Sequence, residues 1–285
     1  MKCTICPNNC NIDRNEQKGA CGVGNDILIS KYYLHPFEEP VISGTKGSGT
    51  VFFSGCSLKC VYCQNYELSR AKRGKIVTPS ELADIFKTLE DAGASNINLV
   101  TPTHYITGIV KAFELYRPNI PVVYNTHGYE TLDGLKIIAP YVDIYLPDLK
   151  FCSSEVSLKY TGKKDYFSVA TNAISYMLES KKTVIENGLM KSGVIVRHLI
   201  LPENVSDSKR VIDWFAKNQK NGAYLSIMAQ YTPFGSIELF PELKRKITKK
   251  EYDRVLEYAQ LSGVENAFVQ DLTSSSEEFI PKWDF

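Results

Sequence analysis

The stretch Gly49-Thr-Val-Phe-Phe-Ser-Gly-Cys-Ser-Leu-Lys-Cys-Val-Tyr-Cys-Gln-Asn65 decides how this chain is interpreted. An apolar run typical of a β-strand leads directly into Cys56, Cys60 and Cys63, spaced as Cys-x3-Cys-x2-Cys. Three thiolates on one loop can bind three irons of a [4Fe–4S] cluster and leave the fourth iron without a protein ligand. An open coordination position is where a metal centre does chemistry. The motif therefore predicts a catalytic iron–sulfur site.

Two other roles for these three cysteines are less favoured. A structural zinc site needs four ligands, usually arranged as two Cys-x2-Cys or similar pairs. Disulfides belong to exported proteins, and the N-terminus, Met1-Lys-Cys-Thr-Ile-Cys-Pro7, lacks the apolar core of a signal peptide. Eight cysteines without an export signal indicate a reducing compartment. We therefore expect a cytoplasmic protein whose thiols bind metal.

Length and composition limit the class of protein. The 285 residues suffice for one large α/β domain and a small appendage. A content of 44% hydrophobic and 23% charged residues is ordinary for a globular protein. The net charge of +1 gives no global reason to expect nucleic acid as a partner. No apolar run approaches the length of a membrane span, so no membrane partner is expected either.

Strand-like and helix-like segments alternate from about residue 49 onward. The expected strands are Val51–Ser54, Ile97–Val100, Val122–Tyr124, Ile144–Leu146, Val194–Leu201 and Leu225–Met228. The expected helices cover 108–117, 168–180 and 206–218, or begin at the capping boxes Thr78–Glu81 and Thr248–Glu251. Six strands that alternate with helices predict a parallel α/β fold. The alternation alone does not separate a barrel from an open sheet.

Polar residues follow the apolar cores of four of these strands. They are Thr101-Pro-Thr103, Asn125-Thr-His127, Asp148-Leu-Lys150 and Gln230-Tyr-Thr232. The C-terminal ends of parallel strands converge on one mouth, where barrel enzymes place their active sites. We therefore expect these polar side chains to lie close together.

Over nearly its whole length the chain resembles one family. The matching stretches are 54–65, 98–105, 123–129, 145–150, 196–202 and 228–235. With Tyr62 directly before the last cysteine, the motif resembles that of radical S-adenosylmethionine (SAM) enzymes, and the other stretches resemble pyruvate formate-lyase activating enzyme-like members. The resemblance implies an incomplete (β/α)6 barrel in which SAM binds the open iron and is cleaved to a 5′-deoxyadenosyl radical that abstracts hydrogen. It also implies a reductant such as flavodoxin or ferredoxin.

The resemblance further implies how the mouth holds SAM. In such enzymes a Gly-Gly-Glu-Pro-type segment binds the SAM amino group, whereas this chain has Thr101, Pro102 and Thr103 there and offers no carboxylate. Asp148 and Lys150 resemble the Asp-x-Lys of activases, whose lysine pairs with the SAM carboxylate. Both can point into the barrel because they share one face of a strand.

The remaining candidates at the mouth are Asn125, Thr126, Arg197 and Gln230. Asn125 and Thr126 stand where activases have an acidic residue and a threonine near the SAM methionyl group. Arg197 lies within an apolar strand, so its guanidinium needs an anionic partner: SAM, an acidic substrate or an internal salt bridge. Gln230 ends the last strand and is expected to line the pocket.

His104, His127 and Cys152 also fall near the mouth. Lone histidines are more often ordinary hydrogen-bonded residues than acid–base groups, and a lone buried cysteine is usually inert. We therefore expect no direct role for most of them.

Four further cysteines, Cys3, Cys6, Cys10 and Cys21, lie near the N-terminus. Four thiolates would organise a short segment that cannot build a core alone, as structural zinc sites do. An auxiliary [4Fe–4S] cluster with four protein ligands is the alternative, and the spacing does not decide between them. The expected organisation is a Cys-rich metal-binding extension over 1–45, a partial barrel over 46–270 and a tail over 271–285.

Three functions fit these patterns. The first is activation of a glycyl-radical enzyme, in which hydrogen leaves a glycine Cα of the partner. The second is radical SAM chemistry on a small metabolite, a peptide or RNA, although near-neutral charge disfavours RNA. The third is a non-catalytic iron–sulfur or zinc-binding protein, which would explain the cysteines but not the polar residues at the strand ends.

Overall fold

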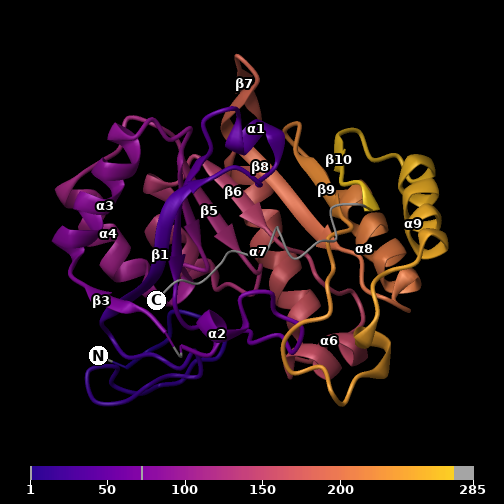
Figure 1. Cartoon of the computed structure of the whole chain (residues 1–285), viewed down its shortest axis with the longest axis horizontal. Helices are drawn as coiled ribbons and strands as arrows, with labels where there is room; N and C mark the ends of the chain where they lie inside the picture. Colours follow the sequence, from indigo (N-terminus) through magenta and orange to yellow (C-terminus); the bar gives the residue numbers. More distant parts are fainter. Residues whose placement is uncertain (1, 72, 273–285) are drawn as a thin grey trace.

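The structure is a computed structural model that describes residues 2–71 and 73–272 (Figure 1). Its strands are β1 Ile27–His35, β2 Ser48–Phe53, β3 Lys75–Val77, β4 Ile97–Val100, β5 Val122–Thr126, β6 Ile144–Pro147, β7 Val184–Glu186, β8 Leu189–Leu199, β9 Tyr224–Met228 and β10 Ala267–Val269. Within the described residues they form one sheet in the order β10-β9-β8-β6-β5-β4-β2-β1-β3, with β7 paired to β8 outside this path.

The centre of the sheet is parallel. Strands β2, β4, β5, β6, β8, β9 and β10 pair in parallel with their neighbours in this order. The residues of β2 and β5 are all buried, as expected for parallel strands covered on both faces. The prediction of an α/β fold with a parallel sheet is confirmed.

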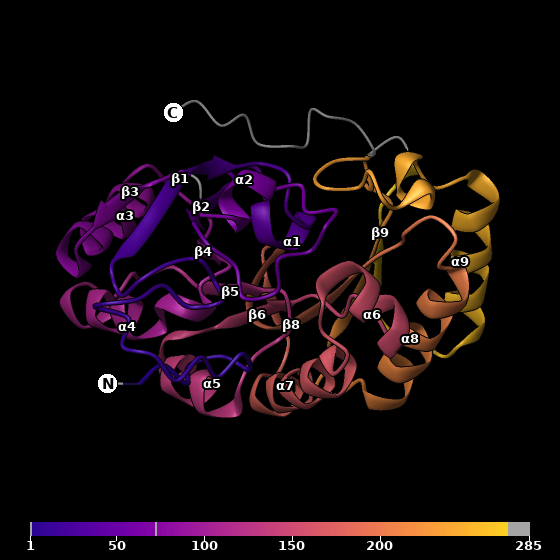
Figure 2. The ribbon, with the colours of Figure 1, turned by 90° about the horizontal axis from the view of Figure 1, so that it is seen from below.

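Helices connect the parallel strands and cover the sheet. They are α1 Pro40–Ser43, α2 Tyr66–Ser69, α3 Pro79–Asp91, α4 Ile106–Leu115, α5 Leu132–Ile138, α6 Ser154–Thr161, α7 Tyr166–Ser180, α8 Val205–Asn218 and α9 Lys249–Leu261. Figure 2 shows α3, α4, α5, α7, α8 and α9 as an arc around the strands. The apolar residues of these helices pack against the strands in one large core.

Both predicted capping boxes are present. The Thr78 hydroxyl accepts a hydrogen bond from the Glu81 amide at 3.2 Å, and the Glu81 carboxylate accepts one from the Thr78 amide at 2.7 Å. Thr248 and Glu251 repeat this exchange at the start of α9. Each box satisfies amide groups that a helix would otherwise leave without partners at its N-terminus.

Strand β1 was not expected. It lies inside the range 1–45 that we interpreted as the Cys-rich extension, yet it pairs antiparallel with β2 and with β3. The chain before it, residues 2–26, forms no helix or strand and has one isolated bridge, between Lys2 and Asp13. Of the expected tail 271–285, only residues 271 and 272 are described; residues 273–285 lie outside the described residues.

Within the part of the chain that the structure describes, no helix has both the length and the apolar character needed to cross a membrane.

Candidate active site

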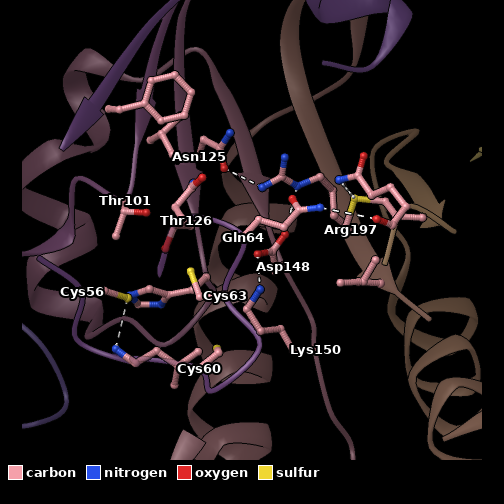
Figure 3. A pocket seen from close by; sticks show the side chains of 18 of the residues that line it. Cys56, Cys60, Cys63, Gln64, Thr101, Asn125, Thr126, Asp148, Lys150 and Arg197 are labelled. Carbon is pink, nitrogen blue, oxygen red and sulfur yellow. Dashed lines mark hydrogen bonds and ion pairs between the residues drawn. The ribbon is translucent and has the colours of Figure 1, made fainter. Parts of the chain in front are cut away.

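A cavity of about 220 Å³ lies at the C-terminal ends of the parallel strands (Figure 3). It is lined by the cysteine motif and by residues that follow or end β2, β4, β5, β6, β8 and β9. The predicted site residues among its lining are Cys56, Cys60, Tyr62, Cys63, Thr101, Asn125, Thr126, Asp148, Lys150, Arg197 and Gln230. The folded chain thus brings together side chains from six of the parallel strands and the cysteine motif.

All three cysteines of the motif face this cavity. The sulfur of Cys56 accepts hydrogen bonds from the amides of Leu58 and Lys59 at 3.4 and 3.5 Å. Burial raises the pKa of Cys60 to about 12 and that of Cys63 to about 11, so the thiols would be protonated without a bound cation. A cluster that binds thiolates fits this donor set, because the amide groups point at a sulfur that becomes anionic on ligation.

The motif lies on a loop with little regular structure, which three distant segments hold in place. The amide of Cys56 donates to the carbonyl oxygen of Cys21 at 3.1 Å, and the amide of Val61 donates to that of Tyr160 at 2.9 Å. The amide of Ser236 donates to the Val61 carbonyl oxygen at 2.8 Å. We call residues 56–65 the cysteine loop.

Gly235 allows the last of these contacts. Its φ of +91° is in the left-handed region, and a Cβ at this position would collide with the Val61 carbonyl oxygen. The segment after β9 can therefore approach the cysteine loop only with glycine at residue 235. The hydroxyl groups of Tyr66 and Ser236 add a contact of 2.5 Å beside it.

A network of charged side chains forms the wall opposite the cysteines. Arg197 donates from Nε to Oδ1 of Asp148 at 3.0 Å, from Nη1 to Oε2 of Glu38 at 3.3 Å and from Nη2 to Oδ1 of Asn125 at 2.6 Å. Lys150 Nζ donates to Oδ2 of Asp148 at 2.5 Å. Arg197 thus has internal anionic partners, which was one of the three arrangements expected for it.

The network fixes the ionisation of its members. Burial opposes the charged form of Asp148, but Lys150 and Arg197 outweigh it and hold the pKa of Asp148 below its ordinary value. Burial likewise opposes the charge on Lys150, and Asp148 outweighs it and raises the pKa of Lys150. The wall therefore carries fixed charges of both signs at neutral pH.

Glu38 is a member of the site that the sequence analysis missed. It follows β1 and accepts hydrogen bonds from the side-chain amides of Asn98 at 2.9 Å and Asn125 at 3.3 Å, in addition to the one from Arg197. Burial raises its pKa, although Arg197 counteracts this effect. The signal was present as the pair Glu38-Glu39 directly before Pro40, shortly after the segment that forms β1.

Of the segment after β4, residues 101–103, only the first residue lines the cavity. Thr101, with a left-handed φ of +59°, lines the cavity. Pro102 and Thr103 are not part of the lining, and the Thr103 hydroxyl instead donates to Oε1 of Glu130 at 2.6 Å. Thr126 also donates to Glu130, whose burial raises its pKa to about 7.

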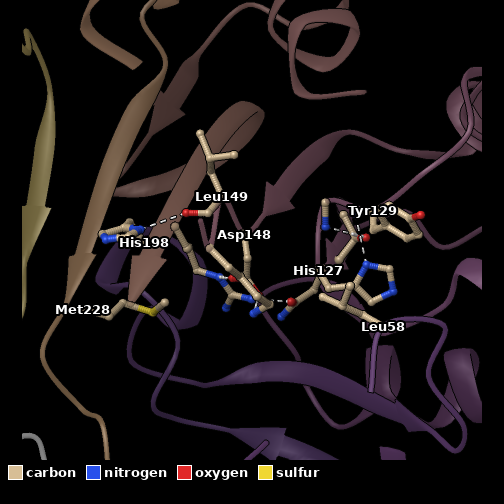
Figure 4. A network of polar contacts seen from close by, with 12 residues as sticks. Leu58, His127, Tyr129, Asp148, Leu149, His198 and Met228 are labelled. Atoms are coloured by element: carbon tan, nitrogen blue, oxygen red, sulfur yellow. Dashed lines mark hydrogen bonds and ion pairs between the residues drawn. The ribbon is translucent and has the colours of Figure 1, made fainter. Parts of the chain in front are cut away.

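The two histidines near the mouth have structural hydrogen bonds. His127 lines the cavity, where its Nδ1 accepts from the Tyr129 amide at 3.1 Å (Figure 4). Its Nε2 lies 2.8 Å from the Ser57 hydroxyl. Burial lowers the pKa of His127 to about 3, so the ring is neutral. His104 lies behind the cavity, with Nε2 2.8 Å from the Ser54 carbonyl oxygen.

The remaining predicted residues are Tyr62, Gln230 and Cys152, which make packing contacts or hydrogen bonds. The Tyr62 ring packs edge-on against Phe151, Tyr160 and Tyr231. The carbonyl oxygen of Gln230 accepts a hydrogen bond from the Gln64 side chain at 3.4 Å. Cys152 does not line the cavity, and its amide donates to Asp207 at 3.1 Å.

The family model of the Radical SAM superfamily matches residues 50–215, which is more than half of the chain. The chain belongs to the radical SAM superfamily. Membership of the radical SAM superfamily implies an enzyme that uses a [4Fe–4S] cluster and SAM. The predicted superfamily is thereby confirmed, and the matched range contains the cysteine loop, Asp148, Lys150 and Arg197.

The chain is also similar to individual proteins. An uncharacterized protein of Methanocaldococcus jannaschii, MJ0674, is 31% identical over 268 residues, which cover 90% of this chain and 74% of that protein. The radical SAM chain is also similar to SuiB of Streptococcus suis bound to SAM, at a TM-score of 0.51 and 15% identity over 78% of this chain and 50% of SuiB. Methylornithine synthase (PylB) matches at a TM-score of 0.51 and 14% identity, over 75% of this chain and 60% of PylB.

These solved structures show the fold alone, because their sequence identity to this chain is low. The chain spans about half the length of the SuiB chains it matches. One of these SuiB structures contains the precursor peptide SuiA.

Proposed function

We propose that this protein holds a [4Fe–4S] cluster through Cys56, Cys60 and Cys63 and cleaves SAM reductively, within an incomplete (β/α)6 barrel. The observation that carries the proposal is the convergence of three thiols, two of them buried, and a charged wall on one cavity in a radical SAM chain. When bound, the reduced cluster supplies the electron that cleaves SAM to methionine and a 5′-deoxyadenosyl radical. The chain's own contribution is to bind, orient and enclose SAM.

The charged wall suits the amino-acid part of SAM, which carries an ammonium and a carboxylate group. Lys150 and Arg197 offer cationic donors to the carboxylate. Asp148 and Glu38 offer anionic acceptors to the ammonium, and Glu38 supplies a carboxylate of the kind that the segment after β4 lacks. Charge-assisted hydrogen bonds of this type fix orientation as well as affinity.

The remaining lining residues enclose the site. Thr101, Asn125, Thr126 and Gln230 present polar groups at the C-terminal ends of β4, β5 and β9. The ring of Tyr62 lines the cavity together with Cys60 and Cys63 and packs among other aromatic rings. We propose that these residues exclude water from the reacting part of SAM.

For the substrate we propose a glycyl-radical enzyme as the first candidate, on the resemblance of Asp148 and Lys150 to activases. A peptide or a small metabolite is the second candidate. This second candidate is favoured by a cluster of aromatic rings that line the cavity. The ring centres of His35 and Phe37 lie 5.7 Å apart, and those of His35 and Phe52 lie 6.2 Å apart. Such rings can pack against a bound side chain.

The proposal includes a flavodoxin- or ferredoxin-type electron donor, since reductive cleavage consumes one electron for each SAM. It also includes a cytoplasmic location and a metal centre at the four N-terminal cysteines.

One experiment tests the central claim. The protein is reconstituted anaerobically with iron and sulfide and then incubated with SAM and a low-potential reductant, and 5′-deoxyadenosine is measured. Formation of 5′-deoxyadenosine is expected, and its absence from a preparation with a full cluster would refute the proposal and leave a non-catalytic iron–sulfur protein. Deuterium transfer from a labelled candidate substrate into 5′-deoxyadenosine then identifies the target.

A further inference from the structure

The cavity has an aromatic side that the proposed contacts with SAM do not use. Its members are His35, Phe37 and Phe52, which we call the aromatic wall. His35 ends β1, and Phe52 lies on the neighbouring strand β2. Side chains alternate along a strand, so His35 shares one face of β1 with Tyr33, and the register places Phe52 on the same side of the sheet. The pairing of the two strands thus fixes where these rings lie.

Three other rings pack around the ring of His35. Its plane is nearly perpendicular to those of Tyr33, Phe37 and Phe52, at angles of 84°, 81° and 82°. Edge-to-face packing of this kind is one of the arrangements that aromatic rings prefer. Only 9% of His35 is exposed. The packing therefore holds the imidazole in one orientation, which sets the directions of its two nitrogens.

Tyr33 determines which nitrogen of His35 carries the hydrogen. Its hydroxyl oxygen lies 2.9 Å from Nδ1 of His35. Burial raises the pKa of Tyr33 to about 12 and lowers that of His35 to about 4, so both groups are neutral at neutral pH. We assign the phenol as the donor, because a neutral imidazole nitrogen is a good acceptor and the hydroxyl has no other acceptor within the described residues. Nε2 of His35 therefore carries the ring hydrogen.

Nε2 of His35 is available to a ligand in the cavity. It makes no hydrogen bond within residues 2–71 and 73–272, although His35 lines the cavity. His127 and His198 differ, since both ring nitrogens of each have protein partners. His104 lies outside the cavity lining. Of the four histidines of the chain, His35 is thus the one that presents an N–H donor to the cavity.

The charge beside the aromatic wall disfavours an anionic ligand. Glu38 also lines the cavity, and its charge adds to the rise in the pKa of Tyr33, so its electrostatic effect extends to this wall. His35 is neutral and offers no positive charge to balance a carboxylate. An amide carbonyl can accept the Nε2 hydrogen without bringing a charge into a buried place. The aromatic wall therefore fits a neutral carbonyl next to an apolar group.

We propose that His35 donates from Nε2 to an amide carbonyl oxygen of the substrate, while Phe37 and Phe52 contact the apolar side chain beside that carbonyl. The substrate class is then a peptide-linked residue, and not a free amino acid with its carboxylate. Tyr33 is a positioning residue that keeps the hydrogen on Nε2. The inference rests on the proposed function, because it leaves the charged wall and the cysteine loop to SAM and the cluster.

Binding of small probes tests the substrate class without catalysis. N-acetyl-L-phenylalaninamide, N-acetyl-L-phenylalanine and N-acetyl-L-alaninamide are titrated by calorimetry into the cluster-loaded protein, with and without SAM. We expect the first probe to bind at least about tenfold more tightly than the second, which brings a charge, and than the third, which lacks a ring. Equal affinities for the amide and the carboxylate, or no binding of the first probe at millimolar concentration, would overturn the proposal.

Four variants assign the contact. His35→Ala should lose about five- to tenfold in affinity for N-acetyl-L-phenylalaninamide, the effect of one hydrogen bond. His35→Gln should recover part of this loss, because its side-chain amide can donate, and Tyr33→Phe should fall between wild type and His35→Ala. Tyr32→Phe, the matched change on the opposite and more exposed face of β1, should bind as wild type does.

Two outcomes of these titrations would contradict the assignment. Unchanged affinity for the amide probe in His35→Ala would show that the ring does not bind it. A parallel loss of affinity for SAM in His35→Ala would assign the aromatic wall to the adenine of SAM instead of the substrate.

The tautomer is tested by ¹⁵N NMR of the imidazole groups in the folded wild type, so this result does not depend on whether His35→Ala folds. The signals of His35 are those that disappear in His35→Gln. We expect hydrogen on Nε2 in wild type and a mixture of tautomers in Tyr33→Phe, whereas hydrogen on Nδ1 in wild type would overturn the proposal. If SAM is not cleaved but the probe affinities and the tautomer are as expected, the proposed function fails and the carbonyl site stands.

Discussion

Arg197 donates a hydrogen bond of 3.0 Å from Nε to Oδ1 of Asp148, and a backbone bridge joins the same two residues. Because Lys150 binds the other oxygen of Asp148, one largely buried carboxylate pairs with two cations. Glu38 forms an ion pair with Arg197 and so balances the second of the two positive charges. A bound zwitterion would therefore replace these internal ion pairs with ion pairs of its own. Removing one charged member of the network should then change the affinity for SAM.

Lys150→Ala should weaken SAM binding more than it weakens the fold. The variant removes a charge-assisted contact worth about 1.5–3 kcal/mol, while Asp148 keeps Arg197 as a partner. Isothermal titration with SAM and thermal unfolding of the cluster-loaded protein measure the two effects. Lys249→Ala, at an exposed lysine paired with Asp253, is the control and should change neither. Unchanged SAM affinity in Lys150→Ala would remove Lys150 from the binding site.

Cys60→Ala should abolish formation of 5′-deoxyadenosine, because a cluster with only two remaining thiolates on the cysteine loop is not held in place. Product is measured by chromatography after anaerobic incubation with SAM and reductant. Cys152→Ala, which alters a cysteine outside the cavity lining, should react as the wild type does. Full activity of Cys60→Ala would mean that the cluster is bound elsewhere.

Glu130→Gln should change how stability depends on pH. Burial raises the pKa of Glu130 from 4.5 to about 7, so between these values the folded protein keeps a proton that the unfolded chain has released. The contribution of Glu130 to the unfolding free energy is thus complete below pH 4.5 and falls by about 3 kcal/mol as pH rises to 7.

The glutamine variant cannot lose that proton, and its amide oxygen can still accept from Thr103 and Thr126. We expect denaturant unfolding to show a variant more stable than wild type at pH 8, with the difference vanishing near pH 4.5. Glu257→Gln, on the exposed face of α9, controls for the loss of a charge. Parallel pH profiles for wild type and Glu130→Gln would contradict the raised pKa.

Gly235→Ala should loosen the cysteine loop. The left-handed backbone at Gly235 and the collision with the Val61 carbonyl oxygen together should cost about 1–3 kcal/mol of unfolding free energy. Gly263→Ala separates the two causes, because Gly263 also has a left-handed φ, of +76°, but open space around its Cβ position. If both variants lose the same stability, the contact with Val61 carries no strain.

The local patterns predicted the centre of the sheet well. Apolar runs such as 97–100 and 144–146 need burial on both faces, and the capping boxes at Thr78 and Thr248 mark where helices begin. The cysteine motif and the polar residues after the strands located the cavity, because parallel strands must end on one side.

What the sequence did not disclose depends on contacts between distant segments. Strand β1 mixes apolar residues with Ser30, Lys31 and two tyrosines, since one of its faces is partly exposed, and it was therefore overlooked. Glu38 follows β1 and enters the site only because β1 pairs with β2. The turn that directs Thr103 to Glu130 instead of the cavity likewise follows from the left-handed backbone of Thr101.

The cysteine loop is anchored to Cys21, Tyr160 and Ser236, which lie in three widely separated parts of the chain. Contacts between residues far apart in sequence form late in folding, because the entropy of closing long loops must be overcome first. The loop can reach its final shape only after α6 and the segment beyond β9 have reached their places. Cluster assembly should therefore follow the folding of the sheet, so that iron–sulfur delivery meets a nearly complete domain instead of a nascent N-terminal fragment.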